Sequence, residues 1–517
     1  MKAKVNWKLF APAMALLLAM IVLIAVNMNF VQQTMGKIYD FCISRFGWLF
    51  VVTNIVCLVF SLWIMFGPYK NVRLGGENSK PAFSTLAWAG MMFTTSCGAW
   101  LVVYGFLEPI YCAAQAPFQI EPLTTKAYEY GQMYAHFHWG PNAWCIYVPI
   151  SVAIGYLLYN RGAKTGTVGT VCQNVLPGRG GRAVSYCADV VSVCSSVIAP
   201  VISIGTGMPL LVVLLERIFN IPDIYRSTLQ ILILSTWVAI FGTSVYLGLQ
   251  KGIKNLSNAN ITIAFVYMLI FGVAVGVFKI LAAEVNTVGL FINNFLRMTT
   301  YTDPYGTGSF VKGWTMSYWA VYFVYMPLMG VFNAKISKGR RLKDIAFGQL
   351  VLCTLGCWVA MATFGNYSMK LQVDGILDIS SYLQTGDEAG AILAILETMP
   401  MPQIMMICLL IISFVFLATT MDSSAFAAAE MTAKQGDSSG LAPRWLRIVW
   451  AAVASVIAYV VLQLGGVKAV RSLCYIAGLP LAILTYPIVV ATVKMLRQDH
   501  EKKAAINTNN SEESENV

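Results

Sequence analysis

Long apolar runs recur along almost the whole chain, and they constrain its fold more than any other feature. Each run has roughly 20 residues, the length that an α-helix needs to cross about 30 Å of hydrocarbon. Charged residues make up only 11% of the 517 residues, which is too few to cover the water-facing surface of a soluble protein. The sequence therefore predicts an all-α integral membrane protein.

Hydropathy places about twelve transmembrane spans along the chain. Two shorter stretches, 285–298 and 381–398, are amphipathic and are expected at the membrane interface. The first span is too long for the apolar core of a signal peptide, so we expect it to be retained. The predicted spans are 8–28, 47–67, 87–113, 132–159, 184–215, 228–248, 258–282, 313–336, 345–369, 403–430, 445–464 and 470–494.

Lys and Arg residues are unevenly divided between the two sides of the predicted bundle. If the N-terminus is inside, 24 of the 35 Lys and Arg residues fall in cytoplasmic segments. Because positive residues concentrate in cytoplasmic loops, both termini are predicted to lie in the cytoplasm, with an even number of spans. The net charge of +11 is then explained by loops that face anionic lipid rather than by nucleic-acid binding.

Two of the predicted spans contain residues that interrupt helices. The third has Ser96-Cys97-Gly98 at its middle, and the fifth contains Pro200 followed by Gly205-Thr206-Gly207-Met208-Pro209. Broken helices at mid-membrane depth line the substrate and ion sites of many transporters. The alternative is that these residues are simply common in transmembrane helices.

Aromatic residues run down the length of the eighth span instead of marking only its ends. Aromatic faces attract cations without hydrogen bonding, so they suit a charged group that has no N–H to donate, such as a trimethylammonium group. The alternative is core packing and anchoring at the interface. The candidate substrate-binding residues are Tyr111 in the third span, Trp139 and Trp144 in the fourth, and Trp314, Trp319, Tyr322 and Tyr325 in the eighth. Tyr318 shares a helix face with Trp314, Tyr322 and Tyr325.

Short motifs spread over nearly the whole chain resemble, in the same order, those of the betaine/choline/carnitine transporter family. Phe137-His138-Trp139-Gly140 and Tyr301-Thr302-Asp303-Pro304 make it most similar to the carnitine/γ-butyrobetaine antiporters of that family. The other motifs are Phe66-Gly67-Pro68-Tyr69, Tyr104-Gly105-x-x-Glu108-Pro109, Gly252-Ile253-Lys254-x-Leu256-Ser257-Asn258, Gly313-Trp314-Thr315-x-x-Tyr318-Trp319-Ala320, Ile336-Ser337-Lys338-Gly339-Arg340 and Thr419-Thr420-Met421-Asp422-Ser423.

The resemblance implies a LeuT-like core of two inverted five-helix repeats that works by alternating access. It also implies a homotrimer in a bacterial inner membrane. The expected organisation is two N-terminal transmembrane helices (1–86), a first repeat (87–283), an amphipathic linker helix (284–311), a second repeat (312–496) and a disordered cytoplasmic tail (497–517).

The chain departs from the family pattern at two places in the expected cage, which the resemblance builds from Tyr111, Trp139 and the eighth span. Val321-Tyr322 replaces a Trp-Trp pair after Tyr-Trp-Ala. In the third span, Ser96-Cys97-Gly98-Ala99-Trp100 replaces a Gly-x-Gly-x-Gly segment. We therefore expect Trp100 to supply the aromatic surface that Val321 lacks.

Two sets of residues bear on ion coupling, and they point in different directions. Thr419 and Thr420 occupy positions where sodium-coupled members carry ligands, and the backbone near Thr94 and Cys97 could complete that site. The neutral Asn260 also matches the sodium-coupled pattern. Hydrogen bonding across helices is an alternative role for the Thr pair. One further residue, Met329, matches a methionine that the antiporter uses in place of a sodium ion.

Glu108 and Arg297 are charged residues expected near membrane depth, where a charge is costly unless it is paired or solvated. A pair between them that closes an outer gate is one interpretation. Snorkelling of Arg297 to the interface is the other.

These observations favour a secondary active transporter of a small zwitterionic or cationic solute, surrounded by lipid and with Na⁺ as the only candidate cofactor. We favour sodium-coupled symport over sodium-independent exchange. A membrane enzyme acting on choline-like substrates is a remote alternative. We predict no enzyme activity and no metal site, because the spans show no Glu/Asp/His cluster and neither His136 nor His138 has a carboxylate nearby in the sequence. No GxxxxGK[ST] motif of an ATP-driven pump is present.

Overall fold

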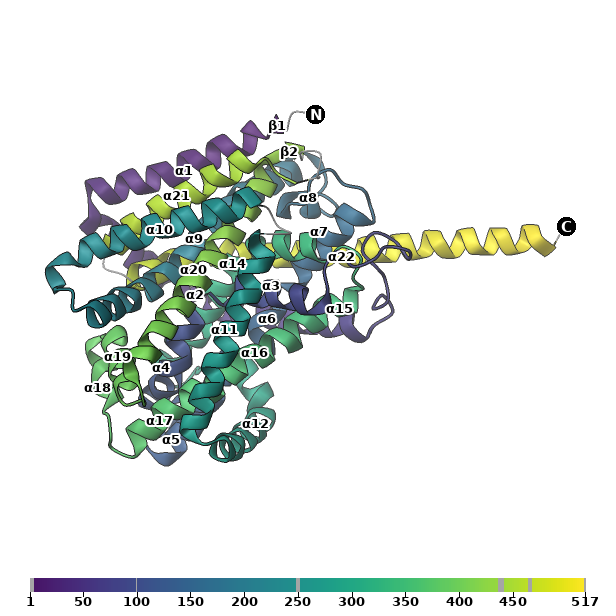
Figure 1. The fold of residues 1–517 in the computed structure, drawn as a ribbon. Helices are drawn as coiled ribbons and strands as arrows, with labels where there is room; N and C mark the ends of the chain where they lie inside the picture. The colour runs from purple at the N-terminus through teal and green to yellow at the C-terminus, as the bar shows by residue number, and fades with distance from the viewer. Residues whose placement is uncertain (1–3, 99, 248–251, 436–440, 464–466, 516–517) are drawn as a thin grey trace.

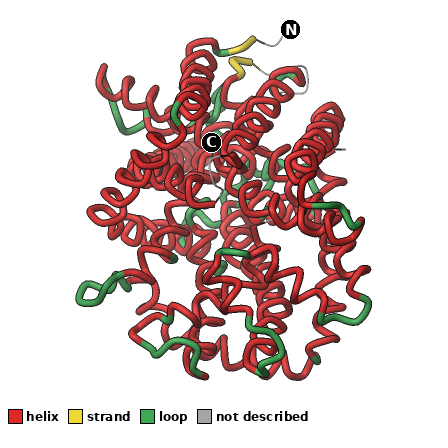
Figure 2. The backbone as a smooth tube through the Cα atoms, turned by 90° about the vertical axis from the view of Figure 1, so that its left-hand side faces the viewer, coloured by secondary structure: helices red, strands yellow, loops and turns green. Residues whose placement is uncertain are grey.

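A computed structural model describes residues 4–98, 100–247, 252–435, 441–463 and 467–515, and most of them are helical (Figures 1 and 2). The predicted all-α class is confirmed. Two short strands, β1 (Lys4–Val5) and β2 (Ala433–Gln435), pair antiparallel. Lys2 and Lys251, which contribute to the cytoplasmic charge count, lie outside the described residues.

The N-terminal half consists of two long helices followed by a series of interrupted ones. Side chains of Ser84 and Thr124 cap α3 and α5 by accepting hydrogen bonds from backbone N–H groups three residues later. The elements are α1 (Trp7–Val26), α2 (Met28–Phe66), α3 (Thr85–Cys97), α4 (Trp100–Gln115), η1 (Pro117–Gln119), α5 (Thr125–His138), α6 (Pro141–Cys145), α7 (Val148–Tyr159), α8 (Val168–Cys172), α9 (Gly178–Phe219), η2 (Asp223–Tyr225), α10 (Arg226–Leu247) and α11 (Gly252–Val275).

The C-terminal half begins with the amphipathic helix α12. Asp378 and Asp387 cap the short helices α18 and α19 in the segment that the sequence places outside. The elements are α12 (Val277–Thr300), α13 (Ser309–Gly313), α14 (Thr315–Ile336), α15 (Leu342–Phe347), η3 (Gly348–Cys353), α16 (Thr354–Ala360), η4 (Met361–Gly365), α17 (Asn366–Val373), α18 (Ile379–Thr385), α19 (Glu388–Glu397), α20 (Pro402–Thr432), α21 (Arg444–Gln463) and α22 (Val467–Glu515).

Eight helices within the described residues are long and apolar enough to cross a membrane, or up to nine if the bent pair α3–α4 counts as one span. Helix is also present at every predicted span range, including those of α10, α14 and α21. The buried helix α14 owes its moderate hydropathy to its Trp and Tyr residues. The count of twelve spans stays a prediction.

The third span is broken, as its sequence predicts. Helices α3 and α4 meet at an angle of 63°. At the break Gly98 has φ +53° and ψ −168°, a region that is essentially restricted to glycine. A Cβ at this position would lie 2.7 Å from Ser203 Oγ and 3.0 Å from Thr420 Oγ1. The backbone of the break therefore closely approaches α9 and α20.

The fifth span is not broken, which agrees with the alternative that its Gly and Pro residues are simply common in transmembrane helices. Helix α9 continues through both Pro200 and Pro209. A proline removes the hydrogen bond to the carbonyl four residues earlier, here the carbonyl of Ser196. That carbonyl accepts a hydrogen bond of 2.6 Å from Ser424 Oγ on α20. The neighbouring helix therefore satisfies the group that the proline leaves without a donor.

Contacts between distant loops divide the molecule into two ends. At one end, segments expected in the cytoplasm meet each other: β1 pairs with β2, and Arg73 Nη1 donates to Gly339 O at 2.6 Å. At the other end, segments expected outside meet: Arg217 lies 2.8 Å from Glu397. These contacts join segments that the Lys and Arg distribution places on the same side, while the identity of each side stays a prediction.

Packing in the bundle links the two halves of the chain. Helix α9 packs along α20, α14 packs against α7, and α4 packs against η4. Packing of helices from one half against helices from the other is expected of two interlocked repeats. The repeat relation and the domain limits stay predictions. The tail differs from the expected disorder, because α22 continues as a projecting helix to Glu515 (Figure 1).

Candidate functional site

Five aromatic rings from three parts of the chain meet at the centre of the bundle, next to the break between α3 and α4. All five side chains are buried. Ring centroids lie 5.1 Å apart for Trp100 and Tyr318, 5.4 Å for Trp100 and Trp139, and 5.7 Å for Trp144 and Tyr322. We call Trp100, Trp139, Trp144, Tyr318 and Tyr322 the aromatic cage.

The cage is built from interrupted segments of the backbone. Trp139 lies in the gap between α5 and α6, Trp144 lies on the short helix α6, and Trp100 begins α4 just after the break. Tyr318 and Tyr322 lie one turn apart on α14, so both point to the same side of that helix. The breaks therefore bring aromatic side chains from separate helices to one depth of the bundle.

A buried carboxylate holds two of the cage rings in place. Glu108 Oε2 accepts hydrogen bonds from Trp139 Nε1 at 2.7 Å and from the Tyr318 hydroxyl at 2.5 Å. Its other oxygen, Oε1, lies 2.7 Å from His138 Nδ1. Three donors thus surround a carboxylate with no solvent exposure. A buried charge is tolerated when it is hydrogen-bonded in this way.

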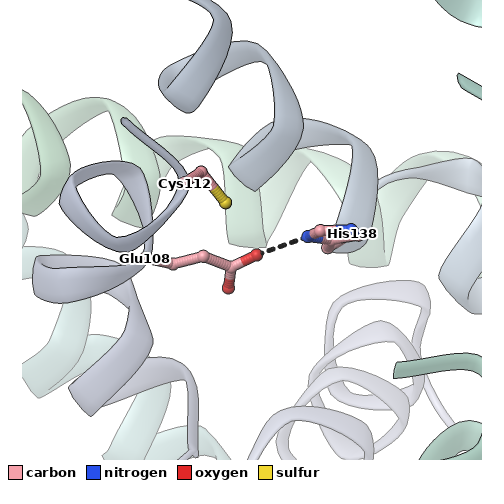
Figure 3. Close-up of side chains that lie close together, drawn as sticks. All are labelled: Glu108, Cys112 and His138. Atoms are coloured by element: carbon pink, nitrogen blue, oxygen red, sulfur yellow. Dashed lines mark hydrogen bonds and ion pairs between the residues drawn. The ribbon is translucent and has the colours of Figure 1, made fainter. Parts of the chain in front are cut away.

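Glu108, Cys112 and His138 bring three potential metal ligands within 4.8 Å of one another (Figure 3). Both histidine nitrogens are already engaged, because Nε2 lies 3.0 Å from Thr315 Oγ1. Both carboxylate oxygens of Glu108 accept hydrogen bonds as well. The chemistry of the cluster is therefore that of a hydrogen-bonded network rather than that of a metal site.

His136 and His138 have no carboxylate nearby in the sequence, but each lies beside one in three dimensions. His136 Nε2 lies 2.8 Å from Glu284 on α12. Burial alone would raise the pKa of the Glu284 carboxyl. Adjacent His136 and hydrogen bonds from Gln132 and Asn366 outweigh burial and hold that pKa below its ordinary value. This pair joins α5 to the amphipathic helix and contacts no ring of the cage.

Four predicted substrate residues lie beside the cage rather than in it. The ring centroids of Tyr111 and Trp314 lie 5.2 Å apart, toward the end of the bundle that is expected outside. There the Tyr111 hydroxyl donates a hydrogen bond of 3.0 Å to Glu388. Trp319 packs against Phe137 on the flank of α14. The Tyr325 hydroxyl hydrogen-bonds to Ser203 Oγ at 3.0 Å, one turn deeper on α14 than Tyr322.

The predicted ion-coupling residues lie around the break between α3 and α4. Thr420 Oγ1 faces Gly98, and both Thr419 and Thr420 donate their hydroxyl protons to Phe416 O. Donation leaves the oxygen lone pairs able to bind a cation. Thr94 donates to Gly90 O.

Three other residues of this predicted set have different surroundings. Cys97 Sγ lies 3.4 Å from Cys357 Sγ, and Met329 Sδ lies 3.8 Å from Ser96 Oγ. Asn260 is buried on α11, and its amide has no hydrogen-bond partner among the described residues. The structure therefore brings Thr420 and the break together but does not bring Asn260 to them.

Of the two interpretations of Glu108 and Arg297, the one in which they pair to close an outer gate is wrong. Glu108 is engaged with His138, Trp139 and Tyr318. Arg297 instead lies over two aromatic rings, 4.9 Å from the centroid of Phe118 and 5.3 Å from that of Tyr301. Among the ion pairs of the described residues none joins Glu108 to Arg297. The buried carboxylate instead lies among hydrogen-bonding groups of His138, Trp139 and Tyr318.

A family model of betaine/carnitine/choline family transporters matches residues 8–501. The chain belongs to this family. The match covers nearly the whole sequence, including every residue of the cage and its carboxylate. The family resemblance proposed from short motifs is therefore confirmed, and with it the assignment as a membrane transporter.

In this betaine/carnitine/choline family transporter, sequence reasoning missed three residues of the site. Tyr318 was placed on the aromatic face of the eighth span but not in the candidate set. His138 and Tyr147 were not singled out for substrate binding. Tyr147 lies 6.2 Å from Trp144 and 6.3 Å from Tyr322 by ring centroid, and its buried hydroxyl has no hydrogen-bond partner among the described residues. Its spacing of three residues from Trp144, one helical turn, was the available signal.

Proposed function

We propose that this transporter carries a small betaine-type or other quaternary-ammonium solute, such as glycine betaine, carnitine or γ-butyrobetaine. The observation that carries the proposal is the buried aromatic cage of Trp100, Trp139, Trp144, Tyr318 and Tyr322. Each ring face offers a cation about 0.5–2 kcal/mol when the contact is desolvated. A quaternary ammonium group makes full use of such faces, because it has no N–H whose hydrogen bonds must be replaced.

The electrostatic surroundings of the cage support a positively charged head group. The Glu108 carboxylate lies directly behind Trp139 and Tyr318, to which it is hydrogen-bonded. A buried negative charge acts strongly in this water-poor interior. The hydroxyl of Tyr147 could donate to the carboxylate of a zwitterionic solute, since it has no partner among the described residues.

The cage rings contact one another at centroid distances of 5.1 to 5.7 Å for the pairs named above. Rings this close leave no room for a trimethylammonium group between them. Binding therefore requires the α14 rings to separate from Trp100 or Trp139. That separation is a natural first step of alternating access, in which the bundle rearranges around its bound solute.

For coupling, we favour sodium symport. The hydroxyl of Thr420 beside the glycine break supplies the hard oxygen that Na⁺ prefers, and carbonyls at the end of α3 are the expected companions. Sodium-independent exchange is the alternative. It is favoured by Met329, whose sulfur lies 3.8 Å from Ser96 Oγ at the same break.

The setting that we propose is a bacterial inner membrane, with both termini in the cytoplasm and three copies of the chain in a homotrimer. The sidedness rests on the Lys and Arg distribution. The trimer rests on the family resemblance. Lipid and the solute are the expected partners.

Uptake into proteoliposomes tests the proposal. Labelled glycine betaine, carnitine and γ-butyrobetaine are each offered with and without an inward sodium gradient, and with and without unlabelled solute inside. Uptake that needs sodium establishes symport. Uptake that needs only internal solute establishes exchange. Chemical conversion of the solute without accumulation inside the liposomes and without counterflow would favour the alternative of a membrane enzyme.

A further inference from the structure

The Glu108–His138 pair has a geometry that can hold one extra proton without losing a hydrogen bond. His138 Nδ1 faces Glu108 Oε1 at 2.7 Å, so this nitrogen carries a hydrogen in either charge state of the ring. The other nitrogen, Nε2, lies 3.0 Å from Thr315 Oγ1. A threonine hydroxyl donates or accepts by rotating its hydrogen. Nε2 can therefore accept from Thr315 when the ring is neutral and donate to Thr315 when the ring is protonated.

The pair is connected to the cage through a stack of three rings. The His138 ring stacks on Tyr318 with a centroid distance of 4.8 Å and an interplanar angle of 11°. Trp100 stacks on Tyr318 at 5.1 Å and 13°. Tyr318 therefore connects the imidazole of His138 to Trp100 through two stacked contacts. A cation held against the cage face of Tyr318 is then one ring away from the imidazole.

We propose that Glu108, His138 and Thr315 form a proton-binding site that loses its proton when a cationic head group enters the cage. This inference rests on the proposed function, because it assumes a positively charged solute. With His138 neutral the pair carries a charge of −1, which attracts the solute. With His138 protonated the pair is neutral, and the imidazole ring that stacks on Tyr318 carries a positive charge. Solute and proton therefore compete electrostatically although they occupy different places.

The balance of the step is simple. The N–H bond at His138 Nε2 breaks, its proton leaves to water, and the electron pair remains on the nitrogen to accept from Thr315. No oxidant, reductant or metal is needed. Histidine is the side chain whose ordinary titration falls between about pH 5 and 8.

Other titratable groups lie around the pair on neighbouring helices. The phenols of the tyrosines and the thiol of Cys112 ordinarily titrate well above neutral pH, and the carboxylate of Glu388 ordinarily titrates well below it. The charged guanidinium of Arg297 lies beyond Tyr134, and the Tyr134 ring centroid is 5.6 Å from that of His138. These groups are Tyr104 and Cys112 on α4, Tyr134 on α5, Tyr318 and Tyr322 on α14, Glu388 on α19 and Arg297 on α12.

The test uses the purified full-length chain with tetramethylammonium, choline and glycine betaine as probes. Affinity is measured from the tryptophan fluorescence of the site between about pH 5.5 and 8.5. Proton release on binding is measured with a pH indicator in weak buffer. We expect tetramethylammonium and choline to bind more tightly as pH rises, by up to about tenfold per pH unit, which is the limit for one released proton. Each binding event should release up to one proton.

Two variants and one control locate the proton. His138→Gln keeps a donor toward Glu108 but cannot titrate, so any remaining binding should be independent of pH and release no proton. Thr315→Val removes the oxygen that stabilises the protonated ring, so the release should move to lower pH. His136→Gln removes the other buried histidine, two residues earlier, which pairs with Glu284. Its proton release per bound cation should match that of the unmodified chain.

Two results would overturn the inference. One is binding that is independent of pH and without proton release in the unmodified chain. The other is proton release that survives unchanged in His138→Gln. If none of the three probes binds at any pH, the proposed function itself fails, and that outcome is distinct from either of these.

Discussion

The three tyrosine hydroxyls around the cage have different partners. Tyr318 donates to Glu108, and Tyr322 donates to the carbonyl of His138 at 3.0 Å. The hydroxyl of Tyr147 is buried without a partner among the described residues. An unsatisfied buried hydroxyl lowers stability unless a ligand uses it. Tyr147, which lies beside the cage rings Trp144 and Tyr322, is therefore the tyrosine best suited to recognise the polar end of a solute.

Replacing Tyr147 by Phe should separate stability from binding. We expect the thermal midpoint to stay equal or to rise slightly, because the change removes a buried polar group that has no partner. Affinity for glycine betaine should fall by about 10- to 150-fold, the value of one hydrogen bond to a charged group, whereas affinity for choline, which lacks the carboxylate, should change little. Equal losses for both solutes would contradict this role. Tyr134→Phe, which removes another buried hydroxyl without a described partner, is the matched control.

Trp100 contacts three of the other four cage rings, Trp139, Tyr318 and Tyr322. These contacts support the expectation that Trp100 supplies the aromatic surface that Val321 lacks. Trp100 stacks on Tyr318 and meets Trp139 edge-on. Trp100→Ala should weaken solute binding by about 3- to 30-fold, the value of one desolvated cation–π contact, and Trp100→Phe should recover part of the loss. Titration of the detergent-purified variants measures both. Unchanged affinity in Trp100→Ala, beside lost binding in Trp139→Ala, would show that Trp100 only fills space.

The sequence predicts the identities of most cage residues but not their hydrogen bonds. Trp139, Trp144 and Tyr322 stand out because they are aromatic at transmembrane depth. The engagement of Glu108 with His138 could not be predicted, because the two residues lie on different helices and are 30 positions apart. A single sequence supplies periodicity within a helix, whereas pairing between helices depends on their packing.

At the level of elements, the break between α3 and α4 depends on one glycine. Gly98→Ala would place a methyl group 2.7 Å from Ser203 Oγ in a backbone region where other residues are strained by about 1–3 kcal/mol. We expect a lower thermal midpoint and a strong loss of transport. Gly289→Ala on α12, where a Cβ meets nothing within 4 Å, should leave both unchanged. A fully active Gly98→Ala protein would mean that the break straightens during transport.

Cys97 and Cys357 offer a way to test whether α3 moves against α16. Their buried sulfurs lie 3.4 Å apart, and a disulfide requires about 2 Å. In a variant that keeps only these two cysteines, copper-phenanthroline should join them and stop counterflow, and a thiol reductant should restore it. The same treatment of the Cys357→Ser version should have no effect. Undiminished counterflow after complete cross-linking would show that the two helices move together.

The positions of the helices can be predicted from the lengths of the apolar runs, but the positions of their breaks depend on contacts with neighbouring helices. Gly98 interrupts its helix, and the run containing Pro200 does not, although both sequences contain residues that interrupt helices. The difference is the hydroxyl of Ser424, which donates a hydrogen bond to the Ser196 carbonyl in place of the N–H that Pro200 lacks. That contact comes from a helix more than 200 residues away, so composition within the span could not predict it.

For the whole molecule, the contacts at each end of the bundle join segments that the Lys and Arg distribution places on the same side of the membrane. Arg161 and Asp499, both expected inside, lie 2.9 Å apart. Asn286 and Glu129, both expected outside, share a hydrogen bond of 3.3 Å. Charge distribution and three-dimensional contacts are independent observations, because the first uses composition and the second uses packing. Their agreement supports the order of crossings but leaves the absolute orientation to experiment.

That orientation can be measured with two cysteines introduced at exposed positions. Tyr305, which is 99% exposed, lies in the loop before the eighth span and is expected outside. Asn78 lies in the exposed loop after α2 and is expected inside, because positively charged segments stay on the cytoplasmic side. In a background without native cysteines, Tyr305→Cys should react with a membrane-impermeant maleimide in intact cells. Asn78→Cys should react only after permeabilisation. The reverse pattern would invert the predicted orientation, and labelling of both in intact cells would contradict the odd number of crossings predicted between the two loops.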